Sequence, residues 1–124
     1  MAITQAIATV FKQDLMSPGG NLAALTLKCA LYTNAATLNA TTAAYAVGSE
    51  VSSSGTNYTA GGNVLANVAI SVDGTTAIFD ADNVTFPNAT ISAQAALLYN
   101  ANNANSAIAI LDFGGVKTST NGTF

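Results

Sequence analysis

Very few residues of this chain could carry out acid–base, nucleophilic or metal chemistry. Its 124 residues include no histidine, no arginine and a single cysteine, Cys29. General acid–base catalysis most often uses histidine, and serine or cysteine nucleophiles need an adjacent base. A histidine-containing triad and a zinc site of cysteines and histidines are therefore excluded within one chain. The sequence predicts a protein that is not an enzyme, with no catalytic residue and no cofactor.

The remaining candidate for chemistry is the stretch FDADN at residues 79–83. On a strand, Asp80 and Asp82 would point to the same face. Together with Asn83 they could bind a cation such as calcium through oxygen atoms, or form a carboxylate pair of the glycosidase type. The stretch lacks the glycine and the distal glutamate of an EF-hand loop. We therefore expect a turn and a solvated strand edge, and no metal ion, with these three residues as the candidate ligands if a cation binds.

Cys29 and the tyrosines have structural interpretations as well as functional ones. Cys29 lies on the apolar side of an alternating stretch, which indicates a buried structural cysteine. The four tyrosines could line a sugar-binding face, although rim or core positions are expected for them. Tyr45 and Tyr58 lie in a polar segment, and we treat them as candidate contact residues for a partner.

The low charge of the chain excludes several classes of partner. Only 7% of the residues are charged and the net charge is −3, whereas an average soluble domain is about a quarter charged. Three scattered lysines cannot displace many counterions, so nucleic acid is not expected as a partner, and neither is an anionic membrane surface. No run of roughly 20 apolar residues predicts a membrane-spanning helix. Residues 1–10 lack the basic start of a secretory signal.

The elements that must position these residues begin with an N-terminal helix or arm at residues 1–20. Ser17-Pro18-Gly19-Gly20 ends this segment, because proline and two glycines cannot continue a helix. The spacing of its apolar residues fits one face of a helix or arm that contacts a partner or the core. These residues are Ile3, Ile7, Val10, Phe11 and Leu15, and all but Leu15 are candidate contact residues.

Residues 21–124 read as a single β domain. From residue 25 the apolar period changes to two, which is typical of a half-buried strand. Further strands are expected at 64–72 and 75–79, joined by a turn at Asp73-Gly74, and at 90–99 and 107–113. The odd-numbered residues from Ile91 to Tyr99 are expected on one face. Short strands separated by turns predict a mainly β fold, an antiparallel β-sandwich or barrel-like domain with a short N-terminal helix or arm.

Two segments do not fit this pattern of strands and turns. Residues 33–62 are small, polar and punctuated by glycine, and loops of this length are uncommon in compact domains unless they serve a purpose. This segment is therefore a candidate contact surface. The second is Asn121-Gly122, a turn signal with no strand after it. Either the sequence ends before the natural terminus, or the pair belongs to a tail, or another subunit completes the edge.

Several motifs occur in a characteristic order along most of the chain. They are KCAL at 28–31, GTNYTAGG at 55–62, FDADNVTF at 79–86, ALLY at 96–99, ILDFG at 110–114 and NGTF at 121–124. In order and spacing they resemble a family of small tailed-bacteriophage virion proteins. The chain departs from the family in having Phe86 where relatives carry tryptophan, and relatives continue for another strand beyond the last motif.

The resemblance implies a non-enzymatic virion structural protein that decorates or cements the capsid. Its implied partners are the major capsid protein and neighbouring copies of itself, so a homo-oligomer is expected. Its implied location is the capsid exterior, after synthesis in the bacterial host cytoplasm. Two alternatives stay open: a component of the phage tail, neck or fibre base, and a carbohydrate-binding or adhesin-like β module.

Overall fold

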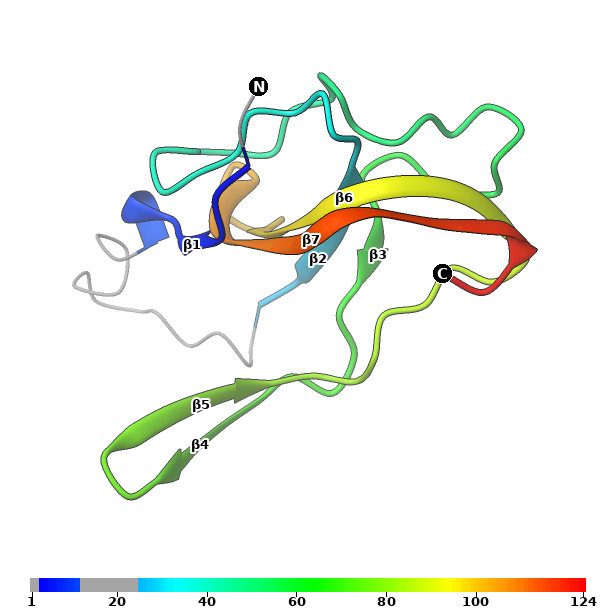
Figure 1. The fold of residues 1–124 in the computed structure, drawn as a ribbon. Helices are drawn as coiled ribbons and strands as arrows, with labels where there is room; N and C mark the ends of the chain where they lie inside the picture. Colours follow the sequence, from blue (N-terminus) through cyan, green and yellow to red (C-terminus); the bar gives the residue numbers. More distant parts are fainter. Residues whose placement is uncertain (1–2, 12–24) are drawn as a thin grey trace.

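The fold is mainly β and its strands are antiparallel, as the sequence predicts. The computed structural model describes residues 3–11 and 25–124. Five strands form one sheet in the order β1-β7-β6-β2-β3, and β4 and β5 form a separate hairpin (Figure 1). The strands are β1 (Ala6–Ile7), β2 (Leu27–Tyr32), β3 (Asn63–Val64), β4 (Ala69–Asp73), β5 (Thr76–Asp80), β6 (Ala89–Asn100) and β7 (Ser106–Gly122).

The described part of the N-terminal segment is an arm attached to the sheet. Ile3 forms a parallel bridge with Leu38, and β1 pairs with β7 so that Ala6 lies opposite Ile110. Only residues 9–11 form a helical turn. Of the two predicted alternatives, the arm is therefore correct for residues 3–8. Pairing with β7 gives backbone N–H and C=O groups of the arm hydrogen-bond partners. An isolated helix of this length would be only marginally stable. Leu15 and the predicted break at residues 17–20 lie outside the described residues.

The sheet is covered on both faces by irregular segments, which gives the protein two core clusters. On the face that carries Cys29, the sheet packs against Val51, Tyr58, Leu65 and Phe86. On the face that carries Tyr32, a second cluster includes residues from the loop at 33–62 and from β6. Its buried members are Ala8, Ala30, Tyr32, Ala36, Leu38, Ala95, Leu97, Tyr99, Ala107 and Ile110. The loop therefore wraps around the end of β2 and contributes to both faces. This covering also explains why β2, predicted to be half-buried, is buried on both sides.

An irregularity in the pairing of β6 with β7 overturns the prediction that the odd-numbered residues of β6 share one face. Ala93 lies opposite Lys117, but Ala95 lies opposite Asp112, so four residues of β7 bulge out beside a single residue of β6. Residues before the bulge pack on the Cys29 face, whereas Ala95, Leu97 and Tyr99 pack on the Tyr32 face. An irregularity of this kind shifts the alternation and sends later side chains to the opposite face.

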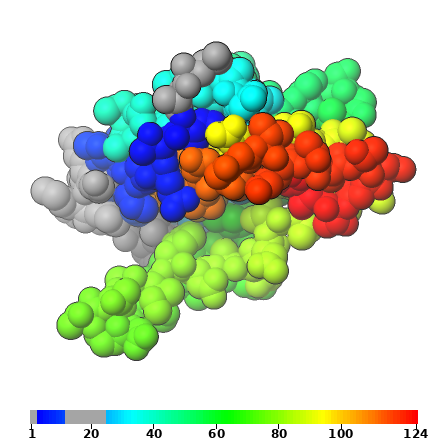
Figure 2. Space-filling view, in the orientation of Figure 1, coloured from blue at the N-terminus to red at the C-terminus, as the bar shows by residue number. Residues whose placement is uncertain are grey.

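The β4–β5 hairpin projects away from the sheet (Figures 1 and 2). Its register places Asp73 opposite Thr76, so the two turn residues are Gly74 and Thr75, and the predicted Asp73-Gly74 turn is wrong by one residue. Gly74 has a φ of 63°, which glycine adopts without strain at the first position of such a turn. The predicted strand at 64–72 is also interrupted after β3. All ten strand residues of the hairpin are exposed.

The C-terminal residues return to the body of the protein. Asn121 and Gly122 belong to β7, where Gly122 lies opposite Ala89. Beyond them, the backbone N–H groups of Phe86 and Phe124 each donate to the other residue's carbonyl, at 3.1 and 3.0 Å. The expectation of a turn at Asn121-Gly122 is therefore wrong. The pair forms the last two residues of β7, with Asn121 at a φ of 51°.

Candidate functional site

The loop at 33–62 is fastened to the sheet by one carboxylate, that of Glu50, the only glutamate in the chain. The Tyr45 hydroxyl donates to Oε1 at 2.7 Å, and the Tyr58 hydroxyl donates to Oε2 at 2.6 Å. The Gly61 N–H also donates to Oε2, at 2.8 Å. Glu50 itself forms a bridge with Tyr32 at the end of β2. Because Tyr45 packs on one face of the sheet and Tyr58 on the other, Glu50 ties the two covering layers together.

The other two tyrosines fix the same loop. The Tyr32 hydroxyl donates to the Ala46 carbonyl, and the Tyr99 hydroxyl donates to the Gly61 carbonyl, both at 2.6 Å. The rings of Tyr45 and Tyr99 stack with their centroids 4.8 Å apart. We refer to Glu50 and the four tyrosines as the tyrosine cluster. Among the described residues, no buried side-chain nitrogen or oxygen lacks a hydrogen-bond partner.

The environment of the tyrosine cluster keeps its hydroxyls protonated. Burial raises the pKa of Tyr32 to about 12. Burial and, second, the hydrogen bond to Glu50 raise the pKa values of Tyr45 and Tyr58, while burial and then the charge of Glu50 raise that of Tyr99. A phenol with a raised pKa remains a hydrogen-bond donor at neutral pH. The cluster can therefore hold the loop, but its donors and acceptors are engaged within the chain.

The tyrosines do not form an exposed aromatic platform. Tyr32, Tyr58 and Tyr99 are each only 2% exposed, and the Tyr58 ring packs against Phe86. Tyr45 is half-buried against Tyr99. A sugar-binding face needs open ring surfaces, so the residues that suggested a carbohydrate-binding module serve the core. The expected burial of Cys29 is confirmed, and burial raises the pKa of its thiol to about 11.

The acidic stretch at 79–83 lies where the hairpin rejoins the body. Asp80 is the last residue of β5 and accepts from the Ala81 N–H at 2.9 Å. Asp82 lies beyond the strand and accepts from Asn67 Nδ2 at 2.6 Å, which fastens the two stems of the hairpin. Asn83 is exposed. In the part of the chain that the structure describes, no three Asp, Glu, His or Cys side chains are grouped so as to hold a metal ion.

The candidate contact residues of the N-terminal segment are only partly available at the surface. Ile7 is 48% exposed. Ile3, Val10 and Phe11 are half-buried and pack against the core clusters. Among these four candidates Ile7 therefore has the most exposed side chain, and the other three stabilise the domain.

An apolar groove lies between the Cys29 face of the sheet and the segment that leaves β5. It has a volume of about 420 Å³. Its walls include Leu98 of β6, Leu111 and Phe113 of β7, and Phe79 of the hairpin. Phe124 also lines it, with its ring 6.2 Å from that of Phe113. Since Phe79 belongs to both features, the groove continues directly onto the hairpin.

The apolar face of the hairpin is a candidate contact surface that the sequence did not indicate. Residues directly opposite each other on paired strands share a face. One face therefore carries the pairs Ile70–Phe79 and Val72–Ala77. Of these, Ile70 is 48%, Val72 72% and Phe79 37% exposed. Ile70 and Val72 are open to solvent, whereas Phe79 also borders the groove that Leu98, Leu111 and Phe113 line.

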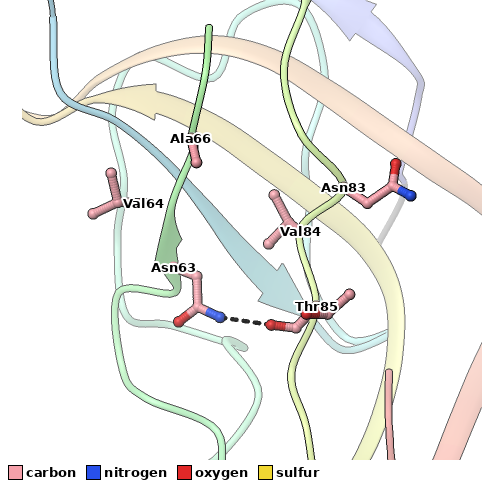
Figure 3. A pocket seen from close by; sticks show the side chains of 6 residues that line it. All are labelled: Asn63, Val64, Ala66, Asn83, Val84 and Thr85. Atoms are coloured by element: carbon pink, nitrogen blue, oxygen red, sulfur yellow. Dashed lines mark hydrogen bonds between the residues drawn. The ribbon is translucent and has the colours of Figure 1, made fainter.

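A second, more polar cleft of about 350 Å³ lies beside β3 (Figure 3). Asn63, Val64 and Ala66 form one wall, and residues 83–85 form the other. Asn63 Nδ2 donates across the cleft to the Thr85 carbonyl at 2.9 Å (Figure 3). The lining carries no charged side chain, and this bond holds together the two segments that lead to the hairpin.

Comparison with protein-family models, with curated proteins and with solved structures finds no match for the chain. Among residues 3–11 and 25–124, no helix has the length and hydropathy needed to cross a membrane.

Proposed function

We propose that this protein is a non-enzymatic structural component of a tailed-phage particle. It decorates or cements the capsid through contacts with the major capsid protein and with copies of itself. The observation that carries this proposal is the exposed apolar hairpin on a chain with only 7% charged residues. Contiguous exposed apolar surface marks sites of protein–protein contact.

The chemistry of the described residues supports an assembly role over a catalytic one. Glu50 is engaged by three internal donors, and Asp82 by Asn67. The ordered motifs of the sequence are the reason for proposing a phage particle. The hairpin supplies a surface suited to assembly on such a particle. Neutral Asn, Thr and Ala surfaces allow many copies to lie side by side without charge repulsion.

The test uses purified full chain and phage heads and tails prepared without it. We expect saturable binding to heads, measured by cosedimentation, and immunogold label on the outside of the capsid. Label confined to tails would move the protein to the tail, neck or fibre base. Absence of saturable binding to either part of the particle would refute the proposal.

A further inference from the structure

We propose that the apolar face of the β4–β5 hairpin packs against the same face of a second copy of this chain. The inference rests on the proposed function only in taking a copy of the chain as a partner. The face consists of Ile70, Val72, Ala77 and Phe79, which lie together by register and are exposed to solvent.

The distribution of charge on the hairpin allows two copies to meet on this face. The hairpin carries two carboxylates, Asp73 and Asp80, and no cation. Asp73 lies opposite Thr76 and Asp80 opposite Ala69, so both belong to the reverse face. Packing two identical apolar faces together therefore leaves the four carboxylates of the pair on the outside, where water screens them.

The side-chain sizes suit a two-fold arrangement with the hairpins antiparallel. The large pair Ile70–Phe79 lies near the base, and the smaller pair Val72–Ala77 lies near the turn. A two-fold axis across the face sets each small pair against a large pair, as close packing requires. The hairpin extends away from the body (Figure 2), so the two bodies lie at opposite ends of the pair.

The area available sets the strength of this contact. Ile70, Val72 and Phe79 are 48%, 72% and 37% exposed, which at roughly 150–200 Å² per side chain is about 250–300 Å² per copy. Two copies would thus bury about 500–600 Å² from these residues, roughly a third of a standard interface. The groove that Phe79 shares adds contact area beside the tip of the partner hairpin. A contact of this size is weak in solution and becomes effective when many copies are held on one particle.

The experiment measures self-association of the purified full chain by sedimentation equilibrium up to about 1 mM, the range that suits a weak dimer. Ile70→Glu places a charge in the contact, and Ile78→Glu is the matched control, because Ile78 lies on the reverse face opposite Ser71. We expect concentration-dependent dimerisation, weakened at least 10-fold by Ile70→Glu and changed less than twofold by Ile78→Glu. Circular dichroism and thermal unfolding establish that both variants fold.

Disulfide cross-linking tests the orientation. Cys29 is buried, so an introduced cysteine is the accessible thiol of the described chain. The two-fold arrangement places residue 72 of one copy near residue 70 of the other. A mixture of the Val72→Cys and Ile70→Cys variants should therefore cross-link faster than the Val72→Cys variant alone. Equal rates would overturn the two-fold arrangement.

A monomeric wild-type chain over the whole concentration range, or an equal effect of the two glutamate variants, would overturn the self-contact. If self-association fails in one of these ways but Ile70→Glu also loses binding to the capsid, the hairpin contacts the capsid protein instead of a second copy. The proposed function would then remain intact. Self-association that responds as expected, in a chain that binds no phage particle, would refute the proposed function and support the self-contact.

Discussion

Replacing Glu50 should destabilise this protein more than replacing any other carboxylate that the structure describes. Its side chain accepts hydrogen bonds from Tyr45, Tyr58 and the Gly61 N–H at 2.6–2.8 Å. A hydrogen bond to a charged group contributes about 1.5–3 kcal/mol net, and bonds that share one acceptor are not additive. We therefore expect Glu50→Ala to lower the free energy of unfolding by about 3–5 kcal/mol, a large part of the roughly 5–15 kcal/mol of a typical domain.

Glu50→Gln separates the charge from the shape of the side chain. The amide keeps one acceptor oxygen but replaces the other with an NH2 group, which cannot accept the hydrogen bonds donated to that position in the wild type. We expect a loss of about 2 kcal/mol for this variant, between wild type and alanine. Urea unfolding followed by circular dichroism gives the values. The matched control is Asp73→Asn, whose carboxylate is exposed on the hairpin and which should stay within about 0.5 kcal/mol of wild type.

A double-mutant cycle with Tyr58→Phe tests whether the hydrogen bonds carry the effect. If they do, the effects of Glu50→Ala and Tyr58→Phe are strongly coupled, since each removes the same bond. A loss below about 1 kcal/mol for Glu50→Ala, or additive effects in the cycle, would refute the view that one carboxylate holds the two covering layers together.

Three further predictions concern close packing, titration and the N-terminal arm. Gly62→Ala should prevent folding or cost more than about 3 kcal/mol in urea unfolding, because a Cβ there would lie 1.8 Å from the Cys29 carbonyl oxygen at a φ of +80°. Gly48→Ala, which has open space, should be nearly neutral. Absorbance at 295 nm should show no tyrosine ionisation in the folded protein near the usual pKa of about 10. The pKa values of the tyrosines are raised in the folded protein, to about 12 for Tyr32. The contribution of the protonated hydroxyls to stability is therefore complete below pH ~10 and is lost as the pH rises toward 12. Ionisation of all four tyrosines near pH ~10 without unfolding would contradict this prediction. Deleting residues 1–11 should lower the melting temperature, since it removes β1 and the buried Ala8; an unchanged melting temperature would show that the arm does not stabilise the sheet.

The antiparallel β fold could be predicted because its signals are local. Alternating apolar residues in β2 and a glycine turn between β4 and β5 each depend on a few neighbouring residues. The face assignments in β6 could not be predicted, since Ala93, Ala95 and Ala96 fit either side of a sheet equally well. The exact turn residues were also ambiguous, because Gly74 can occupy either central position of a two-residue turn.

The tyrosine cluster could not be predicted because it depends on the path of an irregular segment, although the three donors to Glu50 lie only 5 to 11 residues away in sequence. Glu50 and its donors belong to a segment without regular structure, and Tyr99 reaches Gly61 from a distant strand. One signal was present in the sequence: the only glutamate of a charge-poor chain lies between Tyr45 and Tyr58. An isolated carboxylate in such a segment indicates a fixed hydrogen-bonding role, although its partners become evident only in the fold.

The distribution of apolar residues between core and surface argues that the hairpin is kept for contact. Of the 23 buried apolar residues in the described chain, nine are alanine, so the core is thin and its covering segments lie close to the sheet. Among residues 3–11 and 25–124, nine large apolar residues are exposed, and four of them lie on the hairpin: Ile70, Val72, Ile78 and Phe79. A chain selected only for stability would place these larger side chains inside, where burying each contributes about 1.5–3 kcal/mol. Their position outside costs solubility as well as core volume, and the proposed contact with another protein surface would offset both costs.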